Sequence, residues 1–323
     1  MQRFHKKNIA WALLAIVGYL VLYLLIQARV INAYYEITLV TIMINIIYAV
    51  GLNLILGVAG QFSLGHAGFI AIGAYGGAIL GTMVPGMAGM YLGMLAGVAV
   101  SIIVALLVGI PTLRLKGDYL AIATLGVAEI IRVALINMQG ITNGAAGING
   151  IPLSTTWTIV YVFLVLTTIL ILNYAYSSAG RATYAVLQDE IAAESMGVNV
   201  TKYKIIAFIL GAVTASIGGT LSATYIGVVT PSDFTFTKSI DILIIVVFGG
   251  IGSFTGSFVA AILLGLVNMI LQPYGQIRMI IYAVALVLIM VFRPGGLLGT
   301  KEFRFGSLVE KFFKKKGKKE ESA

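Results

Sequence analysis

The sequence predicts an all-α protein, a polytopic bundle of transmembrane helices with about ten membrane crossings, some of them short or broken. Hydrophobic residues make up 59% of the 323 residues and charged residues only 10%, whereas a soluble domain carries roughly 25% charged residues. The 38 glycines suit close packing of helices in a bilayer. The apolar residues also fall into long runs, so lipid is the expected solvent.

Several apolar runs precede the main polar segment of the chain. They cover residues 8–26, 37–56, 62–84, 91–110, 119–138 and 157–174. Each is close to the roughly 20 residues that one helical crossing needs. The first run follows Lys6 and Lys7 and is longer than the core of a signal peptide, so we expect an uncleaved span. A signal peptide cleaved near Ala28 is the alternative.

Three further runs follow, and basic residues decide how the middle one is counted. The runs cover residues 205–226, 240–271 and 277–292. Lys and Arg cluster at the N-terminus, in the segment 176–204 and in the tail 300–323, and the positive-inside rule places such segments in the cytoplasm. The tail joins the others only if 240–271 crosses twice, turning within 249–257. We therefore expect one transmembrane domain with both termini cytoplasmic; a single tilted helix and an external tail are the alternative.

The segment 176–204 is the one long polar stretch between two apolar runs. A simple connection between spans needs only a few residues. Helix-forming composition over 185–196 predicts one short helix, and Gly197 predicts its end, because glycine adopts the left-handed conformation without a Cβ penalty. We expect this segment to be a docking element for a soluble protein.

The sequence gives no sign of a catalytic site, a metal or a cofactor. Cysteine is absent, which excludes disulfides and thiolate chemistry. The two histidines, His5 and His66, lie far apart, and no phosphate-binding GxxxxGK[ST] motif occurs. The net charge of +9 comes from loops and tails at the expected cytoplasmic face, so it does not indicate nucleic-acid binding.

Polar residues inside the predicted spans are candidates for a translocation path. Asn45 and Asn53 are eight residues apart and share one helix face. Glu129 and Arg132 are three apart, which predicts an ion pair facing protein or water, because an isolated charge in hydrocarbon is costly. A structural pair and a role in the path both stay open, as do packing and proton-relay roles for His66. The full set is Asn45, Asn53, Gln61, Ser63, His66, Glu129 and Arg132.

Three stretches of the chain resemble a known family. They are GLNLILGVAGQFSLGHAGFIAIGAY (51–75), LKGDYLAIATLGVAEIIR (115–132) followed by NGAAGINGIP (143–152), and GRATYAVLQDEIAAESMGVNVTKYKIIAF (180–208) followed by FGGIGSFTGSFVAA (248–261). In this order they resemble the branched-chain amino acid ABC transporter permeases of the LivM type. The resemblance implies a permease that performs no chemistry itself.

The resemblance also implies a role for the segment 176–204. Permeases of ABC importers carry a cytoplasmic coupling helix with a Glu-Ala-Ala motif, three further residues and a Gly. Here Glu190, Ala192, Ala193 and Gly197 match it, with Ile191 inserted after the acid. Small alanines let such a helix enter a groove on the ATPase, and Gly ends it. Asp189 and Glu194 complete the predicted coupling residues, because the insertion lets a neighbouring acid take the place of Glu190.

The resemblance implies that the chain carries leucine, isoleucine or valine into a bacterial cell through the plasma (inner) membrane. The implied partners are a second, related permease chain, two ATPase subunits, an external solute-binding protein and the lipid bilayer. A permease for urea, short amides or other amino acids is the first alternative. An ion-coupled secondary transporter is the second, and a docking segment for an ATPase speaks against it.

Overall fold

The computed structural model describes residues 2–28, 32–84, 86–112, 115, 117–271 and positions 274, 280, 284, 287, 295–297 and 299, without the side chains of 2–14. The chain divides into two compact units, residues 1–37 with 301–323 and residues 38–300. Helix α1 (Gln2–Gln27) belongs to the first unit. Helix α2 (Ala33–Asn53) begins in the first unit and continues into the second, which holds the other described helices.

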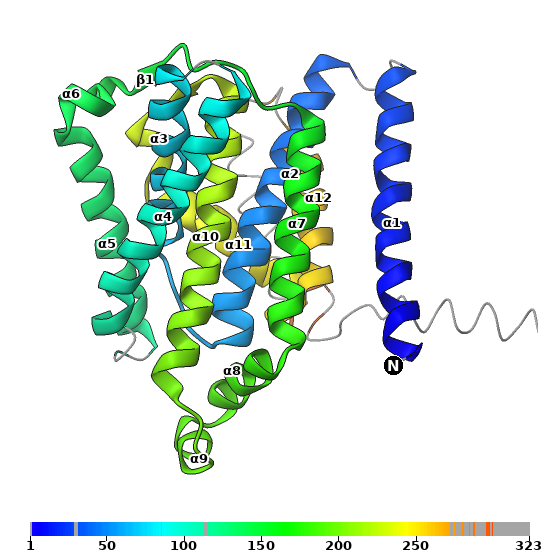
Figure 1. The fold of residues 1–323 in the computed structure, drawn as a ribbon, viewed down its shortest axis with the longest axis vertical. Helices are drawn as coiled ribbons and strands as arrows, with labels where there is room; N and C mark the ends of the chain where they lie inside the picture. Colours follow the sequence, from blue (N-terminus) through cyan, green and yellow to red (C-terminus); the bar gives the residue numbers. More distant parts are fainter. Residues whose placement is uncertain are drawn as a thin grey trace, which may run out of the picture. The chain divides into compact units, whose positions relative to one another are not determined.

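Long helices of the second unit lie alongside one another (Figure 1). The spans are α2 (Ala33–Asn53) with the π-helical turn η1 (Leu54–Val58), α3 (His66–Met83), α4 (Met87–Thr112), α5 (Asp118–Asn137), α7 (Trp157–Tyr176), α10 (Val200–Ile226) and α12 (Phe254–Leu271). These 7 segments are long and apolar enough to cross a membrane. The predicted all-helical, polytopic bundle is therefore confirmed.

Shorter elements connect the spans at two opposite ends (Figure 1). One end carries α6 (Gln139–Thr142), the 3-10 turns η2 (Gly144–Ala146) and η3 (Pro231–Phe234), and a two-stranded antiparallel pair. In that pair, Ile148 of β1 (Ile148–Asn149) lies opposite Val229 of β2 (Val228–Val229). The other end carries α8 (Ser178–Gln188) and α9 (Glu190–Ser195).

Glycines bring α3, α4 and α10 into close contact at the centre of the unit. A Cβ on Gly73 would come within 1.9 Å of the carbonyl oxygen of Ser216, so only glycine fits there. Thr220 on α10 donates a hydrogen bond of 2.8 Å to the carbonyl oxygen of Gly73. This contact is the close helix packing that the glycine content predicts.

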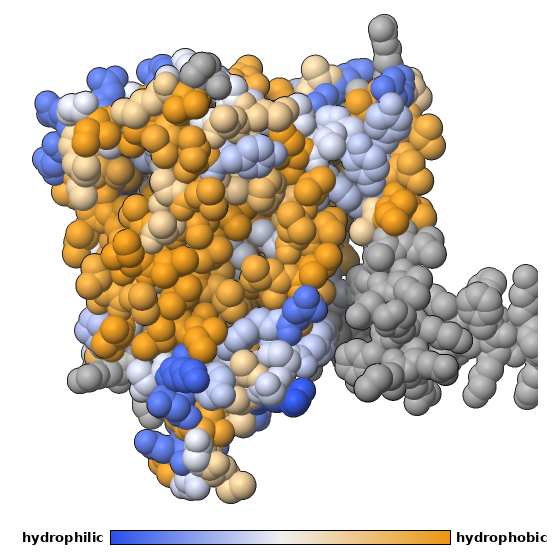
Figure 2. All heavy atoms as spheres, viewed as in Figure 1, coloured by the Kyte–Doolittle hydropathy of each residue, from blue (hydrophilic) through white to orange (hydrophobic). Residues whose placement is uncertain are grey.

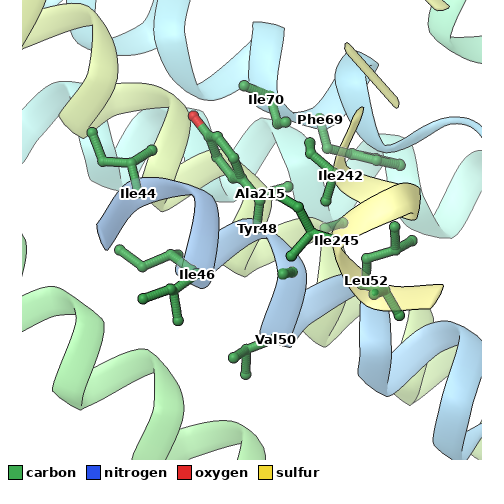
Figure 3. Close-up of a cluster of buried hydrophobic side chains, with 14 of the residues drawn as sticks. Ile44, Ile46, Tyr48, Val50, Leu52, Phe69, Ile70, Ala215, Ile242 and Ile245 are labelled. Carbon is green, nitrogen blue, oxygen red and sulfur yellow. The ribbon is translucent and has the colours of Figure 1, made fainter. Parts of the chain in front are cut away.

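An apolar core joins α2 to its neighbours. Figure 3 shows Tyr48 and Leu52 of α2 packed near Ile70 of α3 and Ile245 of α11 (Phe236–Gly249). All four side chains are buried. The side chains on the outer faces of α4 and α7 are apolar too, and Figure 2 shows an apolar band between two polar ends. The protein is thus a multi-pass membrane protein.

The predicted break within 240–271 is confirmed. Helix α11 ends at Gly249 and α12 begins at Phe254, with Gly250 at a φ of +116° between them. The predicted run 62–84 forms a shorter helix, because residues 59–65 are not helical and α3 begins at His66. Most of the predicted run 277–292 and the whole tail beyond residue 300 lie outside the described residues.

Candidate functional site

The polar segment folds as two helices, so the predicted single helix over 185–196 is wrong. Asp189 separates α8 from α9 with an extended backbone. Its carboxylate accepts hydrogen bonds from the backbone N–H groups of Ile191 at 2.9 Å and Ala192 at 3.0 Å. A short acidic side chain in this position caps a new helix and competes with continuation of the preceding one.

The expected helix end at Gly197 is confirmed. Gly197 has a φ of +82°, in the left-handed region. The following N–H group, that of Val198, donates back to the carbonyl oxygen of Ala193 at 3.0 Å. This pattern satisfies carbonyl groups at the end of α9 that would otherwise lack partners.

The two alanines of the motif differ in exposure. Ala193 is only 5% exposed and packs inside the chain. Ala192 and Glu194 are exposed. Two apolar side chains beside them, Ile191 and Met196, are 77% and 84% exposed. Helix α9 therefore presents a small, partly apolar surface at one end of the bundle, where Figure 1 shows it standing clear of the spans.

An ion pair connects the start of α9 to α10. Glu190 forms an ion pair with Lys204 in the first turns of α10, and Lys204 is largely buried. The carbonyl oxygen of Lys204 accepts a hydrogen bond of 3.0 Å from Gln61. Gly60 lies against Leu187 of α8, where a Cβ would come within 2.5 Å of Leu187 Cδ1. Residues 59–61 thus connect the polar segment to the end of α2.

A shallow cavity of about 220 Å³ lies at this junction. Its lining includes the apolar residues Ala59, Val186 and Leu187 and the acids Asp189 and Glu190. Each acid already has a partner within the chain, a helix cap in one case and an ion pair in the other. The cavity therefore lies where residues 59–60 meet the end of α8 and the start of α9.

Asn53, at the end of α2, holds the turn between α11 and α12. Its Nδ2 donates to the carbonyl oxygen of Ser253 and to Ser257 Oγ, both at 2.9 Å. Its Oδ1 accepts from the N–H group of Gly252 at 2.8 Å. A Cβ on Gly57 would come within 2.3 Å of the Gly252 nitrogen, so the backbones of η1 and this turn nearly touch.

Two other candidate path residues, His66 and Ser63, are buried at or just before the start of α3, and a third, Asn45, lies on α2. His66 is 1% exposed, and its Nε2 has no hydrogen-bond partner among the residues that the structure describes. Ser63 is buried and its hydroxyl accepts from the N–H group of Gly65 at 3.3 Å. Asn45 is half-buried. Their role in a path stays a prediction.

Two hydroxyl residues absent from the predicted set hold the start of α3. Thr124 of α5 accepts from the N–H group of Leu64 at 3.1 Å, and Ser239 of α11 accepts from that of Ala67 at 3.0 Å. The bond to Ala67 satisfies an N–H group in the first turn of α3, which a helix start leaves free, and the bond to Leu64 fixes the backbone just before that helix. In the sequence, Thr124 and Ser239 are hydroxyl residues in or beside apolar runs. Such residues are common in membrane spans, so this feature alone did not identify these two as functional.

Glu129 and Arg132 form the predicted ion pair. Arg132 Nε lies 3.0 Å from each carboxylate oxygen of Glu129. The Glu129 side chain is 49% exposed and that of Arg132 is 24% exposed. The pair therefore lies on the outer face of α5, away from His66 and Asn53. Among the described residues, no group of three or more His, Cys, Asp or Glu side chains is arranged to hold a metal ion.

Comparison with known proteins identifies the family. Residues 34–292 match the family model described as branched-chain amino acid transport system / permease component. Among curated relatives, the permease protein LivM of Salmonella typhimurium is 35% identical over 226 residues, 59% of this chain and 53% of the relative. The permease protein LivH of Escherichia coli is 28% identical over 148 residues, 45% and 47% respectively.

A third relative, the permease protein BraD of Pseudomonas aeruginosa, is 30% identical over 163 residues, 49% of this chain and 52% of the relative. Each of the three is named as a high-affinity branched-chain amino acid transport system permease protein. The chain spans about half the length of the curated relatives it matches. No solved structure matches it. Because the family model covers most of the spans described above, the chain belongs to the branched-chain amino acid transport system permease family.

Proposed function

We propose that this chain is the transmembrane permease subunit of an ABC importer that moves leucine, isoleucine or valine into a bacterial cell. Separate ATPase subunits power it by docking on the segment 176–204, and the chain itself performs no chemistry. The observation that carries the proposal is the construction of α9. Its base is fixed by Glu190 and Lys204, while Ile191, Ala192 and Met196 face outward. A rigidly held helix with an exposed apolar surface is suited to binding a soluble protein.

The complex we propose contains a second, related permease chain, two ATPases and an external solute-binding protein. It lies in the plasma (inner) membrane, with both termini, the segment 176–204 and the tail 300–323 on the cytoplasmic side. The names of the relatives support a branched-chain amino acid as cargo. Urea, short amides and other amino acids are the alternatives, because the binding protein delivers the cargo.

We propose a mechanical route from the ATPases to the path. Closure of the ATPases moves α9, and the Glu190–Lys204 pair passes the movement to α10. Gln61, bonded to the carbonyl oxygen of Lys204, passes it towards η1 and Asn53. Asn53 holds the turn between α11 and α12. Movement of packed helices of this kind switches a transporter between outward and inward access.

The test is a charge placed on the exposed face of α9. Ala192→Arg puts a long cation where the ATPase must approach closely, so we expect normal abundance of the chain, loss of ATPase from the purified complex and loss of leucine uptake. Leu153→Arg is the matched control, because Leu153 is also exposed, at 70%, and belongs to the segment between β1 and α7, at the end of the bundle opposite α9 (Figure 1). It should keep the ATPase. Normal uptake by Ala192→Arg would refute the docking proposal.

Ala193→Arg is unsuitable for this purpose. Ala193 is buried within the chain, so the substitution would disrupt the loop itself before any partner arrives. Its effect on ATPase binding could not be separated from loss of the α9 fold. Ala192 is therefore the position to substitute, because it is exposed and Ala193 is buried.

A further inference from the structure

Helix α5 turns one face away from the rest of its unit. Ile122, Gly126, Glu129 and Val133 lie on this face, at the spacing of successive helical turns. All four are exposed, and Ile122 is 64% exposed. A Cβ on Gly126 would meet nothing within 4 Å. We call these four residues the α5 face.

The α5 face carries charge near the middle of the membrane. Helix α5 has 20 residues, which at 1.5 Å per residue is about 30 Å, the thickness of the hydrocarbon layer. Glu129 lies 11 positions after Asp118 and 8 before Asn137. Neither end of the helix is close enough for its carboxylate to reach the headgroups readily. Arg132 neutralises the charge but leaves a polar, exposed pair.

The exposed faces of α4 and α7 are apolar, unlike the α5 face. The exposed residues of α4 include Leu95, Ile103 and Leu107, and those of α7 include Val162 and Leu166. Neither helix has a charged residue within its span. A charged side chain at the centre of a bilayer is costly, so it is found facing protein or water. By this comparison, the α5 face is not a lipid face.

We propose that the α5 face is the surface on which the second, related permease chain packs, with the Glu129–Arg132 pair bordering a polar passage between the two chains. The proposal rests on the function proposed above, and it specifies where the two permeases meet. Gly126 provides a notch for close approach of a partner helix, as small residues do in membrane interfaces. Because the pair is already neutral, the partner needs to supply only polar groups or water opposite it.

Similarity to two types of permease supports a related chain as the occupant. The chain is 35% identical to a LivM protein and 28% identical to a LivH protein over the aligned parts. A chain related in this way presents a comparable set of spans, so one of them can pack against α5 as a helix of similar length. The interface would then combine apolar contacts from Ile122 and Val133 with the polar pair between them.

Photo-cross-linking in the intact importer tests the proposal. A benzoylphenylalanine replaces Ile122 in one variant and Leu107 in the control, which is 70% exposed on the apolar face of α4. The complex is purified from its host through a tag on this chain and then irradiated. We expect the Ile122 variant to give a product that contains peptides of this chain and of the second permease, and the Leu107 variant to give lipid adducts. Lipid adducts alone at Ile122, or a product with peptides of this chain only, would overturn the proposal.

A second pair of variants tests the notch at Gly126. Gly126→Leu fills it, and Gly140→Leu is the control, because a Cβ on Gly140 also meets nothing within 4 Å but lies on α6. Overpacking a close contact should lower recovery of the second permease about tenfold for Gly126→Leu and leave it unchanged for Gly140→Leu. Equal recovery from the two variants would contradict a close approach at Gly126.

The same preparations separate this inference from the proposed function. ATPase recovered with the Ile122 variant but no link to a second permease would overturn the α5 interface and leave the importer proposal standing. A chain that purifies from its host without ATPase or second permease would overturn both.

Discussion

Replacing Asn53 by alanine should loosen the turn between α11 and α12. The substitution removes two donated hydrogen bonds of 2.9 Å and one accepted bond of 2.8 Å, all made by a fully buried side chain. Ser257 keeps a bond to the carbonyl oxygen of Ser253, whereas the N–H group of Gly252 loses the acceptor that Asn53 gives it.

The size of the effect follows from these bonds. A buried hydrogen bond contributes about 1 kcal/mol net in soluble proteins and about 0.6 kcal/mol in a membrane protein. The three bonds together therefore contribute about 2–3 kcal/mol to the free energy of unfolding. In a chain of this size, 1 kcal/mol corresponds to about 2 °C in Tm. We expect Asn53→Ala to lower the Tm by about 5 °C.

The measurement is thermal unfolding of the detergent-purified chain, followed by tyrosine and tryptophan fluorescence. Asn45→Ala is the matched control, because Asn45 lies two turns earlier on α2 and is half-buried. It should change the Tm by less than about 2 °C. If the Tm of Asn53→Ala falls no more than that of Asn45→Ala, the hydrogen bonds from Asn53 to the turn contribute little to stability. That result would refute the argument about this contact.

Three further predictions follow from charge, pairing and backbone geometry. A cysteine at position 316 of this Cys-free chain should react with an impermeant maleimide only after the membrane is opened; labelling in intact cells would exclude a cytoplasmic tail. Glu129→Gln or Arg132→Leu alone should reduce uptake more than the double variant does, and losses that simply add would contradict mutual neutralisation. Gly197→Val, at a φ of +82°, should strain the end of α9 by about 1–2 kcal/mol and reduce recovery of the ATPase, with unchanged recovery as the contrary result.

Features that depend on local sequence could be predicted. Apolar runs predicted the spans, and the glycines after Phe248 predicted the break between α11 and α12. The Glu129–Arg132 pair followed from a spacing of three residues within one helix. Each of these depends on neighbours in the chain, and periodicity reports such neighbours well.

Features that depend on tertiary contact could not be predicted from one sequence. Asn53 is bonded to residues about 200 positions away, so its burial at the α11–α12 turn has no local signature. Ala193 faces inward because α9 folds back on the chain, which the motif alone does not indicate. The break at Asp189 was not predicted, because the composition of 185–196 favours one continuous helix. The Asp189 carboxylate instead accepts hydrogen bonds from the first turn of α9 and so begins a second helix.

The glycine contacts between α3 and α10 have a consequence for how the protein moves. Carbonyl groups face glycines directly at Gly73 and again at Gly219, where a Cβ would come within 2.2 Å of the carbonyl oxygen of Ile70. Surfaces that fit so tightly cannot slide past one another by small steps, so we expect α3 and α10 to rotate as one rigid body. A force on Lys204 would then turn α3 and α10 together. We expect the angular change to be taken up in the turn between α11 and α12, where Gly250 has a φ of +116°.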